Sequence, residues 1–135
     1  MGGAVHALIG AAIGSLVKNK PAAFAVGIAS HAVADSIPHK DLKPALEAPL
    51  LVAALAAIGA WKGTDSPEFW GALGGVAPDC EHALEISGLI TPKQKIFPTH
   101  INDGKYHGRE NNERVSQYLL AAAAAVVVAL AGDGG

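Results

Sequence analysis

The feature of this sequence that most restricts its fold is a series of long apolar runs, each closed by prolines or charged residues. The runs span 3–17, 22–37, 45–61, 68–90 and 117–131. None shows the alternation of apolar and polar residues that is typical of a strand, and each is long enough for a helix of several turns. We therefore expect an all-α protein, a small bundle of about five apolar helices.

The breaks between the runs predict how these helices connect. Residues 18–21 form a short polar turn, so the first two runs should make an antiparallel helical hairpin. Pro49 is expected to delay the regular helix of the third run to about that residue. Pro78 is expected to kink the fourth run or to divide it into two shorter helices. At this length the chain 1–135 should be a single domain, with a polar loop at 91–116.

The composition narrows the class of protein. Half of the residues are apolar, only 16% are charged against roughly 25% in an ordinary soluble domain, and the mean hydropathy is +0.30. A disordered chain is excluded, and with a net charge of −2 we expect no nucleic-acid partner. Aromatic residues make up 5%, so the apolar fraction consists mostly of small side chains that let helices approach closely. These features indicate a membrane-embedded or membrane-associated bundle, and a soluble bundle remains the alternative.

Length alone does not separate the two classes. Runs of 15 to 17 residues reach about 23 to 26 Å as helices, which is short of a hydrocarbon core of about 30 Å. If the helices alternate across a bilayer, three lysines lie on one side: Lys18, Lys20 and Lys62. The remaining basic residues lie on the other: Lys40, Lys43, Lys93, Lys95, Lys105, Arg109 and Arg114. The positive-inside rule makes that second side cytoplasmic, and we expect membrane lipid as a partner.

The same topology gathers every histidine of the chain towards the cytoplasmic end of the bundle. The candidate metal ligands there are His6, His31, Asp35, His39, Asp79, His82, His100 and His107. Convergence of imidazoles with carboxylates is what a site for a divalent metal such as zinc requires. We expect one to three ions at this end.

The strongest local pattern is HxxxD at 31–35. His31 and Asp35 are four residues apart, so they share one helix face and can bind one metal, and Asp35 can bridge to a second. His39 follows just past the expected helix end. The alternative is a hydrogen-bonded core histidine. An ionisable pair within an apolar segment is expensive unless it is used, which favours ligation.

A second pattern follows Pro78. Asp79 and His82 share a helix face, and Glu85 continues it. Here the alternative is an Asp that caps a helix, followed by solvated acids. Cys80, the one cysteine, excludes an internal disulfide, and its position directs it away from this face.

Together these residues resemble two known families. An N-terminal histidine followed by small residues, a Pro-Asp-x-(Asp/Glu)-His motif at 78–82 and a later pair of histidines resemble the YdjM-like family, bacterial inner-membrane proteins predicted to be metal-dependent hydrolases. The stretch 31–39 is similar to the HxxxD motif of zinc-dependent phospholipase C and related zinc nucleases, which are all-helical and act on phosphodiesters. The resemblance implies metal ligation by His6, His31, Asp35, His39, Asp79, His82 and one or both of His100 and His107.

Three functions follow as hypotheses. The first is a metal-dependent hydrolase, in which zinc lowers the pKa of bound water and Glu81 or Glu85 acts as general base. Its substrate, a phosphodiester such as a phospholipid at the membrane surface, is implied by the resemblance. The second is a metal-binding or metal-transport membrane protein without hydrolytic activity, which at this size would need to form a homo-oligomer to transport. The third is a haem protein that uses His6 and His31.

Overall fold

The computed structural model describes residues 2–36, 44–94, 96 and 115–131. Its α-helices are α1 (Gly3–Val17), α2 (Lys20–Asp35), α3 (Pro44–Lys62), α4 (Pro67–Ile86) and α5 (Val115–Leu130), with a short 3-10 helix, η1 (Pro92–Gln94), after α4. The described residues contain no strand, so the all-α prediction is confirmed. Helix α1 has the predicted bounds, and the other helices differ from the predicted runs by a few residues at their ends.

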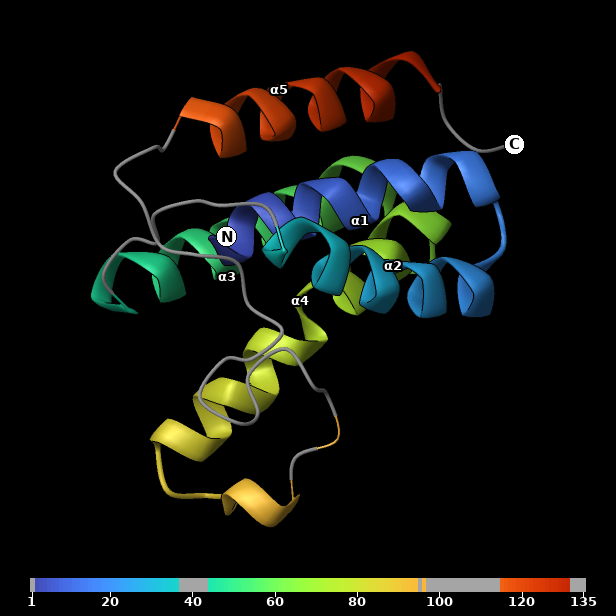
Figure 1. The fold of residues 1–135 in the computed structure, drawn as a ribbon. Coiled ribbons are helices and arrows are strands. Elements are labelled where there is room, and N and C mark those ends of the chain that lie inside the picture. Colours follow the sequence, from blue (N-terminus) through green and yellow to red (C-terminus); the bar gives the residue numbers. More distant parts are fainter. Residues whose placement is uncertain (1, 37–43, 95, 97–114, 132–135) are drawn as a thin grey trace.

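Helix α1 lies at the centre and packs against each of the other four helices (Figure 1). Its contact with α4 is backbone against backbone. A Cβ atom added to Gly10 would lie 2.1 Å from the carbonyl oxygen of Gly71. A Cβ atom on Gly14 would lie 2.1 Å from the carbonyl oxygen of Pro67, so α1 and α4 run antiparallel. The glycines therefore let these two helices approach more closely than any side chain would allow.

The core is built from small side chains, and many large ones lie outside it. The buried cluster consists of Ala7, Ala11, Ala12, Ile58, Ala72, Val76, Ala124 and Val128. Leucines and valines at the surface include Leu46, Val52, Leu119, Val126 and Leu130, all on α3 or α5. The outer helices α3 and α5 contribute only Ile58, Ala124 and Val128 to this cluster, and they keep much of their apolar surface exposed.

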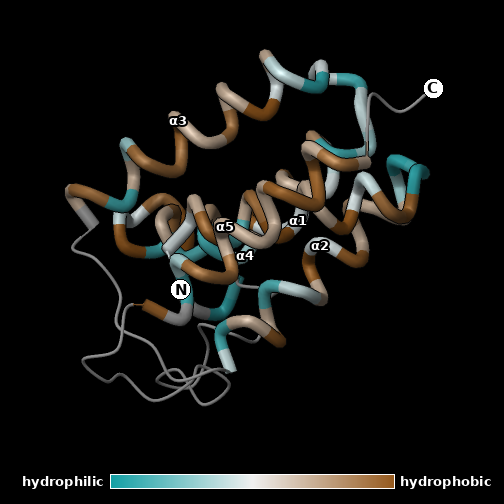
Figure 2. Tube along the Cα trace, turned by 90° about the horizontal axis from the view of Figure 1, so that it is seen from above, coloured by the Kyte–Doolittle hydropathy of each residue, from teal (hydrophilic) through white to brown (hydrophobic). Residues whose placement is uncertain are grey.

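Helix α3 is the one described helix that is long and apolar enough to cross a membrane. Over residues 45–62 its mean hydropathy is 1.5, and only 6% of this stretch is buried by the rest of the protein. Apolar residues follow most of its length in Figure 2. Two other apolar helical stretches, 3–17 and 117–130, are shorter. Of the expected set of spanning helices, the described part of the chain therefore supports one candidate.

The expectation that Pro49 delays its helix was wrong, and so was the division of the fourth run into two helices at Pro78. Helix α3 begins at Pro44 and continues through Pro49. Glu47 in its first turn accepts a hydrogen bond from the backbone of α1. Helix α4 also continues through Pro78, which is buried, so the fourth run is not divided in two. A proline removes one backbone hydrogen bond, and at the buried Pro78 packing on neighbouring helices compensates for that loss.

The N-terminus of α1 is held by side chains from distant helices. Gly2 offers no side chain for capping, but its N–H donates to Oε1 of Gln117 on α5 at 3.1 Å. The N–H of Gly3 donates to Oε2 of Glu47 at 2.9 Å. These bonds satisfy two of the four N–H groups that begin every helix without an intrahelical partner. They also fix the turn of α1 that precedes His6.

Candidate metal centre

Four ionisable side chains from three helices meet where the start of α1 lies beside the end of α2 and the middle of α4. They are His6 of α1, His31 and Asp35 of α2, and Asp79 of α4. The two histidines and Asp35 are almost completely buried, whereas the side chain of Asp79 is 21% exposed. Figure 1 shows these three helix segments side by side. The sequence pattern at 31–35 and the one at 78–82 therefore contribute to a single cluster.

Asp35 contacts both imidazoles. Its Oδ1 atom is 2.9 Å from Nε2 of His6, and its Oδ2 atom is 3.1 Å from Nε2 of His31. The Nε2 atom of His31 is also 3.6 Å from Oδ1 of Asp79. The rings of His6 and His31 stack, with centroids 3.7 Å apart and planes inclined by 20°. Such an array is costly to bury unless its charges compensate one another or a cation does so.

The backbone of α4 fixes the tautomer of His31. Its Nδ1 atom is 2.7 Å from the carbonyl oxygen of Gly75. A carbonyl oxygen only accepts, so Nδ1 carries a proton, and neutral His31 has its lone pair on Nε2, the atom that faces the two carboxylates. Histidines that bind metals commonly donate their other ring N–H to a backbone carbonyl in this way. Sequence patterns did not identify Gly75, because a backbone carbonyl leaves no signal in residue type.

The environment shifts the two imidazole pKa values in opposite directions. Burial lowers the pKa of His6 below its ordinary 6.5, although its hydrogen bond with Asp35 opposes the shift. Burial would lower the pKa of His31 as well, but its contacts with Asp35 and Asp79 outweigh burial and raise the pKa above 6.5. Two stacked imidazolium rings would repel each other, so the charge of His31 also helps to lower the pKa of His6.

The donor atoms suit a divalent metal. His6, His31 and Asp79 can each offer one ligand atom, and these atoms lie within 4.8 Å of one another. Within the described part of the chain, the Nδ1 atom of His6 is buried and makes no hydrogen bond. Two imidazole nitrogens and one carboxylate oxygen form a donor set that zinc accepts readily. A buried imidazole nitrogen that makes no hydrogen bond, such as Nδ1 of His6, fits a position that binds a metal.

The other predicted site residues lie elsewhere or outside the described residues. His82 is on the turn after Asp79, with Nδ1 3.5 Å from Oε2 of Glu85. Oε2 of Glu81 accepts a hydrogen bond from the backbone N–H of Ile96 at 2.7 Å. None of these three belongs to the His6–His31–Asp79 group, and the thiol of Cys80 is exposed. The remaining candidates lie outside the described residues: His39, His100 and His107.

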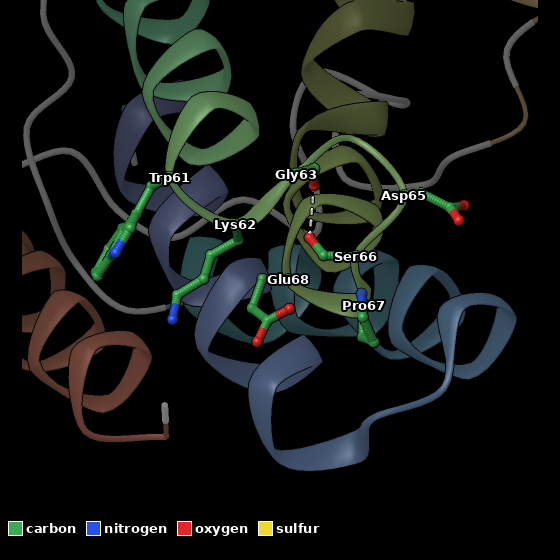
Figure 3. Close-up of a pocket in the computed structure, with 7 residues that line it drawn as sticks. All are labelled: Trp61, Lys62, Gly63, Asp65, Ser66, Pro67 and Glu68. Atoms are coloured by element: carbon green, nitrogen blue, oxygen red, sulfur yellow. Dashed lines mark hydrogen bonds between the residues drawn. The ribbon is translucent and has the colours of Figure 1, made fainter. Parts of the chain in front are cut away.

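A pocket of about 390 Å³ lies at the opposite end of α4 (Figure 3). It is lined by Trp61, Lys62, Gly63, Asp65, Ser66, Pro67 and Glu68. The lining contains no histidine. Its one hydrogen bond drawn in Figure 3, from the Ser66 hydroxyl to the Gly63 carbonyl at 2.7 Å, belongs to the turn that begins α4. This pocket is therefore separate from the candidate metal centre.

Comparisons of the chain with protein-family models, with curated proteins and with solved structures find no match. A proposal about the function of this site therefore rests on the geometry of its residues.

Proposed function

We propose that this chain is a metal-binding protein whose buried centre holds a divalent cation, with zinc as the metal that best suits the donors. His6, His31 and Asp79 are the ligands in this proposal. The observation that carries it is the convergence, from three separate helices, of two imidazoles and a carboxylate whose ligand atoms lie within 4.8 Å of one another.

The charges of the cluster support a cation. Asp35 and Asp79 bring two carboxylates to the two histidines, and Asp35 is completely buried. A single imidazolium offsets the charge of only one carboxylate. A divalent ion offsets both, and it replaces the proton of His31 because a metal ligand must be deprotonated.

A metal-dependent hydrolase is the second candidate function, and the number of ligands favours it. The three ligands found among the described residues leave one position of a tetrahedral zinc ion for water, as in catalytic zinc sites, whereas structural sites have four. Zinc in such a site lowers the pKa of its water to about 7. The partly exposed side of Asp79 would give a substrate its access. A phosphodiester substrate, and Glu81 or Glu85 as general base, remain predictions from the sequence.

We also propose that the protein associates with a membrane, through α3. The apolar length of this helix and its small buried fraction support the proposal. Trp61 and Lys62 at its end are residue types that anchor helices at a membrane interface. Placement in the cytoplasmic membrane, with the metal centre facing the cytoplasm, rests on the distribution of basic residues along the sequence.

Metal analysis of the full-length protein, purified in mild detergent and dialysed against zinc, tests the metal centre. We expect about one bound zinc ion per chain. The variants His31→Gln and Asp79→Asn should bind less than a tenth as tightly. Asp65→Asn is a matched control, since it removes an acidic charge whose side chain is 88% exposed at the other end of α4. Wild-type protein that binds no zinc, cobalt or manganese would refute the metal centre.

Hydrolysis is tested separately with the zinc-loaded protein. The probes are bis(p-nitrophenyl) phosphate and vesicles of phosphatidylglycerol and phosphatidylethanolamine. Turnover that disappears in Asp79→Asn would support the hydrolase. Stoichiometric zinc without turnover on either probe would favour metal binding alone.

A further inference from the structure

We infer that Gly75 is a positioning residue of the metal centre: its missing side chain and its carbonyl together hold His31 in the tautomer that presents Nε2 to the metal. This inference rests on the proposed metal-binding function. It adds a residue of α4 that contributes no ligand atom and that no motif identified.

The first part of the argument is the close approach of α4 to α1. A Cβ atom on Gly75 would lie 2.4 Å from the carbonyl oxygen of His6, a distance that real side chains do not reach. Any larger residue would therefore push α4 away from α1 at the level of the metal centre. Glycine at this position keeps His6 and Asp79, which come from these two helices, close enough to share one ion.

The second part is the hydrogen bond to His31. The Gly75 carbonyl accepts from Nδ1 at 2.7 Å, and both groups are buried. Since no water competes at a buried site, this bond favours the Nδ1–H tautomer strongly. The lone pair of the neutral ring then lies on Nε2, which is 3.6 Å from the Asp79 carboxylate. In the opposite tautomer the Nδ1 lone pair would face the carbonyl oxygen, and Nε2 would be blocked by a proton.

Gly71 provides a matched control. It lies one turn earlier on α4, and its Cβ atom would meet the carbonyl oxygen of Gly10 at 2.1 Å. Gly71→Ala and Gly75→Ala therefore impose the same kind of backbone overlap on the same helix pair. Only Gly75 accepts the hydrogen bond from His31. A difference between the two variants consequently reports on positioning rather than on packing.

The experiment measures the ring nitrogens of His31 by long-range ¹H–¹⁵N correlation in ¹⁵N-labelled protein at pH 8, without metal and with zinc. We expect a proton on Nδ1 in both forms of the wild type, with zinc replacing any proton on Nε2 and shifting the Nε2 signal. Gly75→Ala should mix the tautomers and weaken zinc binding 10- to 100-fold, as loss of a partner behind a ligand typically does. Gly71→Ala should retain the wild-type tautomer.

Two outcomes would overturn the inference: an Nε2–H tautomer in the metal-free wild type, or the same tautomer mixture and zinc affinity in both alanine variants. If either variant fails to fold, the wild-type spectra still decide the tautomer. Failure of the metal centre is recognised separately, because the wild type would then keep the Nδ1–H tautomer without metal while zinc left the Nε2 signal unchanged.

Discussion

The close contact between α1 and α4 makes Gly14→Ala the most informative single substitution for the fold. The new Cβ atom would lie 2.1 Å from the carbonyl oxygen of Pro67 and 2.9 Å from Cα of Glu68. Ordinary contacts begin at 3.4 Å, so the helices must separate by about 1.3 Å here. No side-chain rotation relieves the overlap, because both neighbouring atoms belong to the backbone.

Two opposing effects determine how much Gly14→Ala changes the free energy of unfolding. Alanine is favoured over glycine within a helix by about 1 kcal/mol. Overpacking of a tight interface costs about 1–3 kcal/mol, and backbone-on-backbone overlap places this case at the upper end. The net expectation for Gly14→Ala is a loss of about 2 kcal/mol in the free energy of unfolding, or roughly 30-fold in the folding equilibrium at 1.4 kcal/mol for each factor of ten.

Urea unfolding in mild detergent, followed by far-ultraviolet circular dichroism, measures this loss. Gly59→Ala in α3 is the matched control, since its Cβ atom would meet only side-chain atoms, of Phe69 and Thr64, at 3.2 and 3.3 Å. These side-chain atoms can shift slightly, and helix propensity favours alanine over glycine. The free energy of unfolding of the control should therefore lie within about 0.5 kcal/mol of the wild-type value or above it. A Gly14→Ala protein as stable as the control would show that propensity dominates and that the helices do not pack as closely as the structure has them.

Three further predictions concern single contacts. The pKa of His31 is raised above 6.5, so a proton competes with zinc at its imidazole. Zinc affinity should fall about tenfold for each pH unit below that pKa. A zinc titration in which the affinity does not change between pH 8 and 5.5 would contradict this. Gln117→Ala leaves the buried N–H of Gly2 without its acceptor and should cost about 1–3 kcal/mol in urea unfolding; an unchanged midpoint would mean that the bond is not formed. The ion pair of Lys20 with Asp65 is 2.7 Å long, but the two side chains are 40% and 88% exposed. It should contribute less than about 1 kcal/mol to the free energy of unfolding, which a double-mutant cycle of both residues can check.

Much of the secondary structure could be predicted from the sequence, because helix formation depends on residues close together in the chain. The run 3–17 forms α1 with the predicted bounds, since the apolar run and the polar turn after it are both local signals. The expected division at Pro78 failed for a related reason. Proline is unfavourable within an isolated helix, but Pro78 is buried among other helices, and this packing outweighs the local preference.

For the site, the sequence by itself determined which chemistry is available. The spacing of His31 and Asp35 places both on one face of a helix, and Asp79 follows on another helix, whatever the tertiary fold. Only the tertiary structure decided which of these residues meet. The register of α1 against α4 brings His6 to Asp79, and the register of α2 against α4 brings His31 to the Gly75 carbonyl, while His82 and Glu85 pair one turn beyond. Both registers depend on glycine contacts between helices, and no pattern within one helix records them.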